Sequence, residues 1–276
     1  MTTLNDLHSI SSTFSNTDKM PVLFLGHGSP MNAIEENQFV AGFRNLAKTL
    51  PQPNAILCIS AHWFTNGTKV TSMQMPRTIH DFGGFPQALF DVQYPAKGSP
   101  ELALETKRIL DPVHVDLDEH WGLDHGAWSV IKHLYPEANV PVIQLSIDYT
   151  KSGQYHFELA QKLQSLRHKG VLIIGSGNIV HNLRLVDFRN FDKDNYGYDW
   201  AIEARETINN YLLDENFQPL IDFEKMNKAI QLAIPTPDHY LPLLYTLGLK
   251  EKSEELSLFN DKLLAGSLSM TSVKIM

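Results

Sequence analysis

The sequence predicts an α/β fold: a single domain whose central sheet, largely parallel or mixed, carries helices on both faces. Before Asp199, short apolar runs rich in β-branched residues alternate with longer amphipathic stretches. This alternation is typical of βαβ units, in which successive strands run parallel. The 276 residues and 43% hydrophobic content suffice for one large core, and no repeat or low-complexity linker divides the chain.

The individual elements follow from this pattern. The expected strands are the apolar runs 21–26, 55–61, 69–73, 113–117, 140–147 and 171–175. The expected helices between them are 36–50, 100–110, 127–134 and 153–169. The last helix follows Ser152, a residue type favoured at helix N-termini, and ends before Gly170. Further on, the pattern predicts helices over 200–213, 223–233 and 238–247, then an added edge strand within 255–276.

The start of the chain differs from the rest. Residues 1–20 are polar and rich in Ser and Thr, so we expect a loose N-terminal extension before a single domain over 21–276. The extension has no basic start followed by an apolar core, and it is therefore unlike a secretory signal. No apolar run reaches the roughly 18 residues that a membrane span requires. We therefore expect a cytoplasmic protein without a membrane partner.

Composition argues against nucleic-acid binding and excludes sites that need several cysteines. The formal net charge of −8 and the absence of a Lys/Arg-rich run disfavour nucleic-acid binding. Cys58 is the only cysteine and falls within an expected strand. Disulfides within the chain and cysteine-based zinc sites are therefore excluded.

Several histidines follow the apolar runs. His27 and His62 come directly after two expected strands, His181 follows a third, and His125 follows a looser stretch. In open α/β sheets the loops beyond the carboxyl ends of the strands converge on one crevice, where ligands bind. Imidazoles delivered there from separate strands indicate a metal site or an acid/base site. His239, at an expected helix start, is a further candidate to point toward the strand ends.

Each candidate also has an ordinary structural interpretation. His27 could be a turn histidine bonded to a carbonyl, His62 a buried ring packed on Trp63, and His239 an exposed residue at a helix start. His125 has Asp124 beside it, a carboxylate that can orient an imidazole and raise its pKa. If these residues form a cluster on the surface, His125 has no catalytic role. The other histidines lack such a setting, and most are expected to be structural or exposed: His8, His80, His114, His120, His133, His156 and His168.

Other catalytic motifs are absent. The turn Gly175–Asn178 suggests a phosphate-binding loop, but Val180 stands where a dinucleotide fingerprint needs its third glycine. The chain has neither a Gly-x-Ser-x-Gly elbow nor a His-Glu-x-x-His zinc motif. A mononuclear metal site with one or two additional histidines for proton transfer remains. Imidazole suits Zn, Fe, Cu and Ni alike, so ligand type leaves the metal open.

Six ordered motifs resemble one known family, the 4,5-DOPA extradiol dioxygenases of the class III extradiol ring-cleaving dioxygenases. The resemblance runs from about residue 21 to the C-terminus. The motifs are Phe24-Leu25-Gly26-His27-Gly28-Ser29-Pro30-Met31, Ser60-Ala61-His62-Trp63, Ile79-His80-Asp81-Phe82-Gly83-Gly84-Phe85-Pro86, Asp124-His125-Gly126-Ala127-Trp128, Gly175-Ser176-Gly177-Asn178-Ile179-Val180-His181-Asn182 and Pro237-Asp238-His239-Tyr240-Leu241-Pro242-Leu243-Leu244.

This resemblance implies roles for individual residues. It implies that His27, His62 and His239 bind one divalent metal, and that His125 and His181 bond substrate or oxygen and move protons. His181 is also a possible fourth ligand. Many relatives hold iron with two histidines and a carboxylate, whereas an all-imidazole shell is neutral and accommodates Zn(II) as well. The expected residues in contact with the substrate are Trp63, Phe82, which lies in the loop Phe82–Pro86, and Tyr240.

The expected reaction is ring opening of a DOPA-like catechol by O₂, with 4,5-cleavage and Fe(II) as the metal. Zn(II) has no redox chemistry and should not support it, although it is a plausible bound ion. A zinc-dependent hydrolase using the same histidines is the alternative, since bound zinc lowers the pKa of a water to about 7. A third possibility is a metal- or ligand-binding protein without catalysis, because fold does not fix function.

Overall fold

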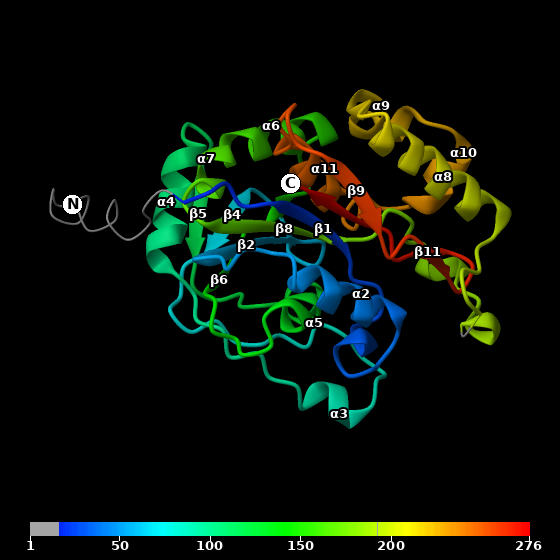
Figure 1. Cartoon of the computed structure of the whole chain (residues 1–276), viewed down its shortest axis with the longest axis horizontal. Coiled ribbons are helices and arrows are strands. Elements are labelled where there is room, and N and C mark those ends of the chain that lie inside the picture. Colours follow the sequence, from blue (N-terminus) through cyan, green and yellow to red (C-terminus); the bar gives the residue numbers. More distant parts are fainter. Residues whose placement is uncertain (1–16, 192) are drawn as a thin grey trace, which may run out of the picture.

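A six-stranded mixed sheet lies at the centre of the computed structural model, which describes residues 17–191 and 193–276 (Figure 1). The strand order is β6-β2-β8-β1-β12-β9. The neighbours β6 (Val142–Gln144), β2 (Ala55–Ser60), β8 (Val171–Gly177) and β1 (Val22–Gly26) run parallel. β12 (Ser272–Ile275) pairs antiparallel with β1, and β9 (Leu256–Phe259) pairs antiparallel with β12. The predicted α/β class with a mostly parallel sheet is confirmed.

The sheet is buried on both faces. Along β1, Leu23 and Leu25 enter one hydrophobic core and Val22 and Phe24 enter the other. Side chains of α2 (Gln38–Ala47) and α5 (His125–Leu134) fill the first core, and those of α6 (Gly153–Lys162) and α11 (Leu241–Gly248) fill the second. Two-sided burial explains why these strands are continuous apolar runs rather than alternating ones.

Shorter elements surround the sheet. Helices are α3 (Gln87–Phe90), α4 (Pro100–Leu110), α7 (Gln164–Arg167), α8 (Asp199–Leu213), α9 (Phe217–Ile221) and α10 (Lys228–Ala233). Single 3-10 turns are η1 (Pro30–Ala33), η2 (Leu183–Leu185), η3 (Phe188–Asn190) and η4 (Phe223–Lys225). The strand pairs are β3 (Phe64–Thr65) with β7 (Ile147–Asp148), β4 (Thr68–Thr71) with β5 (Val115–Asp118), and β10 (Leu263–Leu264) with β11 (Leu268–Ser269).

Several expected elements are rearranged. The runs at 69–73 and 113–117 form the separate pair β4–β5 instead of joining the main sheet, and the run at 140–147 divides into β6 and β7. The helix expected over 153–169 is interrupted at Leu163. The helix expected over 223–233 is divided because the Asn227 side chain accepts from the backbone N–H of Ile230 and starts α10 anew. At the C-terminus, β9 is the edge strand and β12 lies inside the sheet.

Residues 17–20 are bonded to the domain. The backbone N–H of Met20 donates to the carbonyl of Arg167 at 3.0 Å, and that of Thr17 to the carbonyl of His168 at 2.7 Å. The rest of the expected N-terminal extension, residues 1–16 with His8, lies outside the described residues. Within the described chain, none of the helices has the length and apolar character to traverse a bilayer. The cytoplasmic location stays a prediction.

A buried carboxylate joins the strands to α5. Asp124 is the N-cap of α5 and accepts from the backbone N–H of Ala127. It also accepts from Ser60 Oγ at 2.6 Å, at the end of β2, and from Gln144 Nε2 at 2.7 Å, at the end of β6. Asp124 therefore fixes the start of α5 against the carboxyl ends of two strands.

Replacing Asp124 by alanine should destabilise the protein more than removal of an ordinary cap. Loss of the cap costs about 1 kcal/mol, and buried Ser60 and Gln144 donors left unpaired add about 1–3 kcal/mol. We expect Asp124→Ala to lower the free energy of unfolding, measured in urea, by about 2–4 kcal/mol in total. Asn227→Ala, which removes the exposed cap of α10, is the control and should cost about 1 kcal/mol. Equal losses in the two variants would contradict this role for Asp124.

Candidate active site

All five histidines singled out from the sequence line one cavity of about 650 Å³ beyond the carboxyl ends of β1, β2 and β8. His27 follows β1, His62 follows β2, and His181 follows β8. His125 is the first residue of α5, and His239 lies just before α11. The convergence expected for strand ends in an open α/β sheet is therefore observed.

The tautomer of His27 is set by a serine of β8. His27 Nδ1 lies 3.0 Å from Ser176 Oγ, and this hydroxyl donates its single proton to the carbonyl of Gly126. Ser176 must therefore accept from the Nδ1–H of His27, which leaves Nε2 with a free lone pair. Burial, followed by the neighbouring histidines, lowers the pKa of His27 well below its usual value. The neutral ring with Nε2 free is the form that binds a metal.

One carboxylate orients two further histidines. Asp81 Oδ2 lies 3.1 Å from His62 Nδ1, and Asp81 Oδ1 lies 3.0 Å from His125 Nδ1. Oδ1 also accepts the backbone N–H of His125 at 2.9 Å. Burial raises the pKa of Asp81, but the two histidines outweigh it and hold that pKa well below the usual range. The ionised Asp81 carboxylate thus lies at ion-pair distance from Nδ1 of both rings, although the contact with His125 Nδ1 lacks hydrogen-bond geometry.

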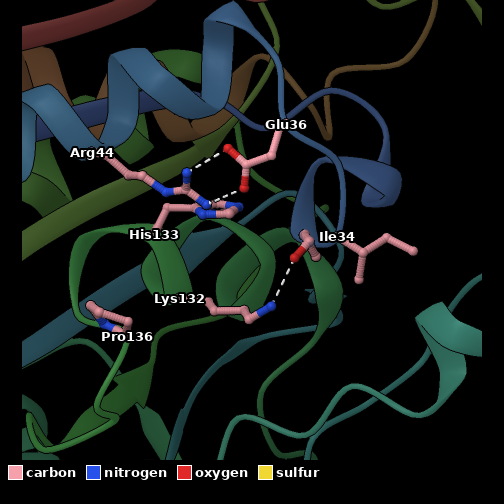
Figure 2. A pocket seen from close by; sticks show the side chains of 7 residues that line it. Ile34, Glu36, Arg44, Lys132, His133 and Pro136 are labelled. Atoms are coloured by element: carbon pink, nitrogen blue, oxygen red, sulfur yellow. Dashed lines mark hydrogen bonds and ion pairs between the residues drawn. The ribbon is translucent and has the colours of Figure 1, made fainter.

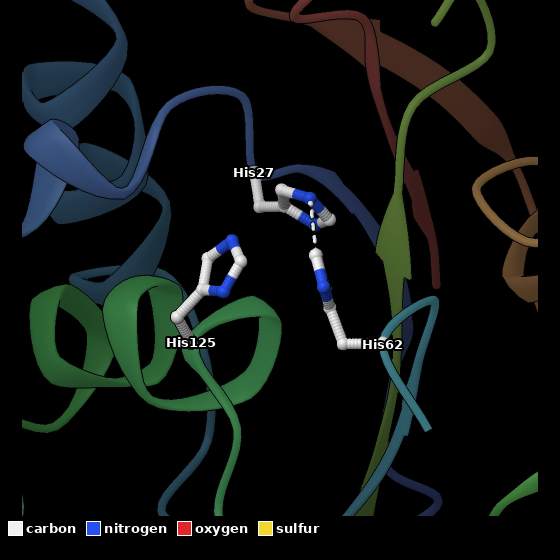
Figure 3. Close-up of side chains that lie close together, drawn as sticks. All are labelled: His27, His62 and His125. Carbon is white, nitrogen blue, oxygen red and sulfur yellow. Dashed lines mark hydrogen bonds between the residues drawn. The ribbon is translucent and has the colours of Figure 1, made fainter. Parts of the chain in front are cut away.

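His62 and His125 differ in proton affinity although they share Asp81. Burial lowers the pKa of His62, but Asp81, with smaller contributions from Asp124 and Asp238, raises it above the ordinary value. For His125, burial and the charge of His62 outweigh Asp81, and the pKa is lowered. The His62 and His125 rings lie close together, with centroids 3.9 Å apart (Figure 3).

Gly126 allows this close approach. A Cβ at this position would lie 2.5 Å from Ser60 Oγ and 2.7 Å from His62 Cδ2. Both distances are shorter than real Cβ contacts, so a side chain here would push the first turn of α5 away from the end of β2. The absence of a Cβ therefore lets His125 and His62 face the same space.

His239 completes a symmetric group of three rings. Its Nδ1 bonds to Asp238 Oδ2, which leaves Nε2 free. The ring centroids of His239 lie 5.2 Å from His27 and 5.1 Å from His62, and those of His27 and His62 lie 5.1 Å apart. Burial lowers the pKa of His239 despite the adjacent Asp238. Each of the three rings has Nδ1 bonded to an oxygen, the arrangement typical of histidine metal ligands.

His181 stacks on His239, with centroids 3.5 Å apart and planes 9° from parallel. Burial lowers its pKa to about 3, with a smaller contribution from His239. Unlike the other four rings, the His181 imidazole has no hydrogen bond or ion pair with any described residue. Its position is held through the backbone, where the N–H of His181 donates to the carbonyl of Ala233 at 2.8 Å.

The residues fit a mononuclear metal. His27 Nε2 and His62 Nε2 lie 3.3 Å apart. Two nitrogens each about 2.1 Å from one ion at a tetrahedral angle would lie about 3.4 Å apart. Ligand atoms of His27, His62 and His125 all lie within 4.8 Å of one another. This group of three includes His125 in place of His239, so the geometry offers two ligand sets that share His27 and His62. The neutral imidazoles supply the donor type that Fe, Zn, Cu and Ni all accept.

Sequence reasoning missed the oxygens that orient the rings. Asp124 was expected to orient His125, but its carboxylate is taken up by the cap of α5 and by Ser60 and Gln144. Asp81 performs this role instead. Its only signal in the sequence is its place in the motif Ile79–Pro86. Ser176 and Asp238 stand within other motifs, and no local pattern distinguishes them as ring partners.

Of the three aromatic residues expected to contact the substrate, the cavity includes Phe82, whose ring centroid lies 5.4 Å from that of His125. Trp63 is buried and stacks on Trp121 at 5.8 Å. Tyr240 is buried, packs on Phe223 and donates its hydroxyl to the carbonyl of Leu220 at 2.9 Å. Neither Trp63 nor Tyr240 lines the cavity, so the prediction that they contact the substrate is not supported. Phe85, in the loop Phe82–Pro86, also lines the cavity, and Phe188 and Phe191 are aromatic lining residues that the sequence did not single out.

Comparison with known proteins assigns the family. The model described as the catalytic LigB subunit of aromatic ring-opening dioxygenase matches residues 21–267. The chain belongs to this family. The prediction of an extradiol ring-cleaving dioxygenase is thereby confirmed.

Similar ring-opening dioxygenases occur in bacteria and plants. The chain is 46% identical to "4,5-DOPA dioxygenase extradiol" of Escherichia coli (strain K12), over 96% of this chain and 98% of that protein. It is 34% identical to the protein of the same name from Beta vulgaris, over 91% and 94%. A crystal structure of an uncharacterized Escherichia coli K12 protein matches with a TM-score of 0.81 and 42% identity. The match covers 94% of this chain and 100% of that one.

Replacing Asp81 by asparagine should weaken metal binding. His62 and His125 face different oxygens of Asp81, and asparagine would replace one of these oxygens by an NH₂ group, which cannot accept a hydrogen bond. Because loss of such orienting groups typically costs 10–100-fold, we expect Asp81→Asn to lower metal affinity by about that factor. Affinity would be measured by competition with a chromophoric chelator. Asp91→Asn, at an exposed carboxylate bonded only to Gln87, is the control and should leave affinity unchanged. Undiminished affinity in Asp81→Asn would contradict the orienting role.

Proposed function

We propose that this dioxygenase opens the ring of a DOPA-like catechol by 4,5-cleavage with O₂, using one Fe(II) held by His27, His62 and His239. The observation that supports the proposal most is the group of three imidazoles with nearly equal separations, each with Nδ1 bonded to an oxygen and Nε2 free. The DOPA-like substrate is inferred from the names of the bacterial and plant relatives.

Iron is proposed because of the chemistry. Bound Fe(II) would supply electrons and open coordination positions for a catechol and O₂, as in other non-haem Fe(II) oxygenases. Zinc fits the same neutral imidazoles but has no redox chemistry. A zinc-loaded protein is therefore expected to be inactive in ring opening, even if it binds the ion well.

His125 and His181 are proposed to move protons. A catechol must lose at least one proton to bind a metal through its oxygens, and a nearby neutral imidazole can accept it. His125 suits this role because the lowered pKa favours its neutral form, while Asp81 stabilises the imidazolium that forms. His181, with a pKa of about 3 and a ring free of fixed partners, is proposed as the second proton-transfer group. Phe82 is proposed to pack against the aromatic ring.

Reconstitution of the metal-free protein tests the reaction and its metal. We expect oxygen uptake with L-DOPA after anaerobic loading with Fe(II), together with a yellow ring-opened product. The zinc-loaded protein should show neither. Absence of uptake with Fe(II) across a panel of catechols would contradict the proposal. Ester or amide hydrolysis by the zinc form without O₂ would favour the hydrolase instead.

Alanine variants separate ligands from proton-transfer groups. We expect His27→Ala, His62→Ala and His239→Ala to lose bound metal, measured by elemental analysis. His125→Ala and His181→Ala should keep the metal but lose about 10²–10⁴-fold in kcat, the usual contribution of a general acid or base. His114→Ala, at an exposed histidine, is the control and should match the unmodified protein. Loss of metal from His125→Ala with retention in His239→Ala would instead favour the ligand set His27, His62 and His125.

A further inference from the structure

The charged lining of the active-site cavity is acidic. Apart from the histidines, its charged residues among the described part of the chain are Asp81 and Glu35, and neither a lysine nor an arginine contributes. The Asp81 carboxylate is occupied by His62 and His125. The carboxylate of Glu35 is solvent-exposed and makes no hydrogen bond or ion pair with any described residue. Glu35 is therefore the charged group of the lining that is left for a ligand.

The position of Glu35 connects it with the reacting end of the cavity. It follows η1, in the same segment that brings His27, Ser29 and Met31 to the cavity. Its backbone N–H donates to the carbonyl of Met31 at 3.0 Å, which ties Glu35 to the turn of η1. A substrate whose catechol oxygens face the imidazoles can therefore direct its side chain along this segment toward Glu35.

The rest of the lining is largely apolar and aromatic. Phe82 and Phe85 contribute from one loop, and Leu183, Phe188 and Phe191 contribute from the segment containing η2 and η3. Aromatic faces attract cations and have no comparable attraction for carboxylates. Arg184 and Arg189 belong to the second segment, but neither lines the cavity. An anionic substrate side chain would therefore lose hydration without gaining a cationic partner, at a net cost.

We propose that Glu35 binds the ammonium group of the substrate, so that the enzyme selects catecholic amines over catecholic acids. This inference rests on the proposed cleavage of catechols and specifies their class. Its distinctive consequence is that a carboxylate on the substrate contributes nothing to binding. A catecholic amine without a carboxylate, such as dopamine, should bind at least as well as L-DOPA, whereas 3-(3,4-dihydroxyphenyl)propionate should bind worse than neutral 4-ethylcatechol.

The adjacent residue, Glu36, provides a matched control. Its carboxylate forms two bonds with the Arg44 guanidinium, at 2.6 and 2.7 Å (Figure 2). It lines a different surface pocket, with Lys132 and His133, and does not line the active-site cavity. The two glutamates thus differ in surroundings but not in chemistry, and replacement of each by glutamine makes the same change of charge.

The test compares the binding of a cationic, a neutral and an anionic catechol. Dissociation constants for dopamine, 4-ethylcatechol and 3-(3,4-dihydroxyphenyl)propionate are measured by calorimetry on the metal-loaded protein without O₂. Glu35→Gln should lower the affinity for dopamine relative to 4-ethylcatechol by about fivefold, as expected for one partly exposed ion pair. Glu35→Lys should lower this ratio further and raise the relative affinity for the propionate. Glu36→Gln should leave both ratios unchanged.

Two outcomes would overturn the inference: ratios that do not respond to either Glu35 variant, or an equal response to Glu36→Gln. Oxygen uptake with L-DOPA, and with a panel of catechols, is measured in parallel on the unmodified, Fe(II)-loaded protein. If neither L-DOPA nor any catechol of the panel is cleaved, the proposed reaction fails while the binding ratios still decide the role of Glu35. If one of them is cleaved but the ratios are insensitive to Glu35, only the inference about substrate class fails.

Discussion

The buried carboxylate of Asp124 is the interaction on which the geometry of the site depends. It joins the ends of β2 and β6 to the first turn of α5 through Ser60, Gln144 and the backbone of Ala127. His62 lies two residues after Ser60, and His125 is the residue after Asp124. Asp124, which does not line the cavity, therefore fixes the chain segments that carry these two imidazoles, while Asp81 orients the rings. A buried polar network of this kind specifies one arrangement only when all its members are satisfied.

The histidines differ because of what lies behind each ring. Ser176, Asp81 and Asp238 bond the Nδ1 atoms of His27, His62 and His239, so that each ring offers Nε2 to the same space. Burial keeps His27 and His239 neutral, which prepares them for a cation without the repulsion that several imidazolium groups would create. His181, whose ring has no hydrogen bond or ion pair with the described residues, is placed instead by stacking on His239. The rings therefore differ in what holds them as well as in their positions.

Sequence patterns predicted the parts of the fold that depend on local order. Continuous apolar runs indicated the parallel strands, and their ends located His27, His62 and His181. The insertion of β12 between β1 and β9 could not be predicted, because it pairs residues some 250 positions apart (Val22 with Ile275) and leaves no local signal. Asp81 was missed for the same reason: it lies in a loop without periodicity, and its role exists only after folding. Trp63 and Tyr240 were misplaced because composition near a histidine does not reveal which side of the chain faces the cavity.

The missing Cβ of Gly126 bears on how mutational data for such enzymes are interpreted. Because Ser60 and His62 occupy the space that any side chain would need, a comprehensive substitution scan should find position 126 as intolerant as the neighbouring histidine. That intolerance would reflect the contact between a helix and a strand end, with no part in bond making or breaking. In this protein, sensitivity to substitution beside the reacting groups is therefore a measure of steric crowding as well as of chemistry.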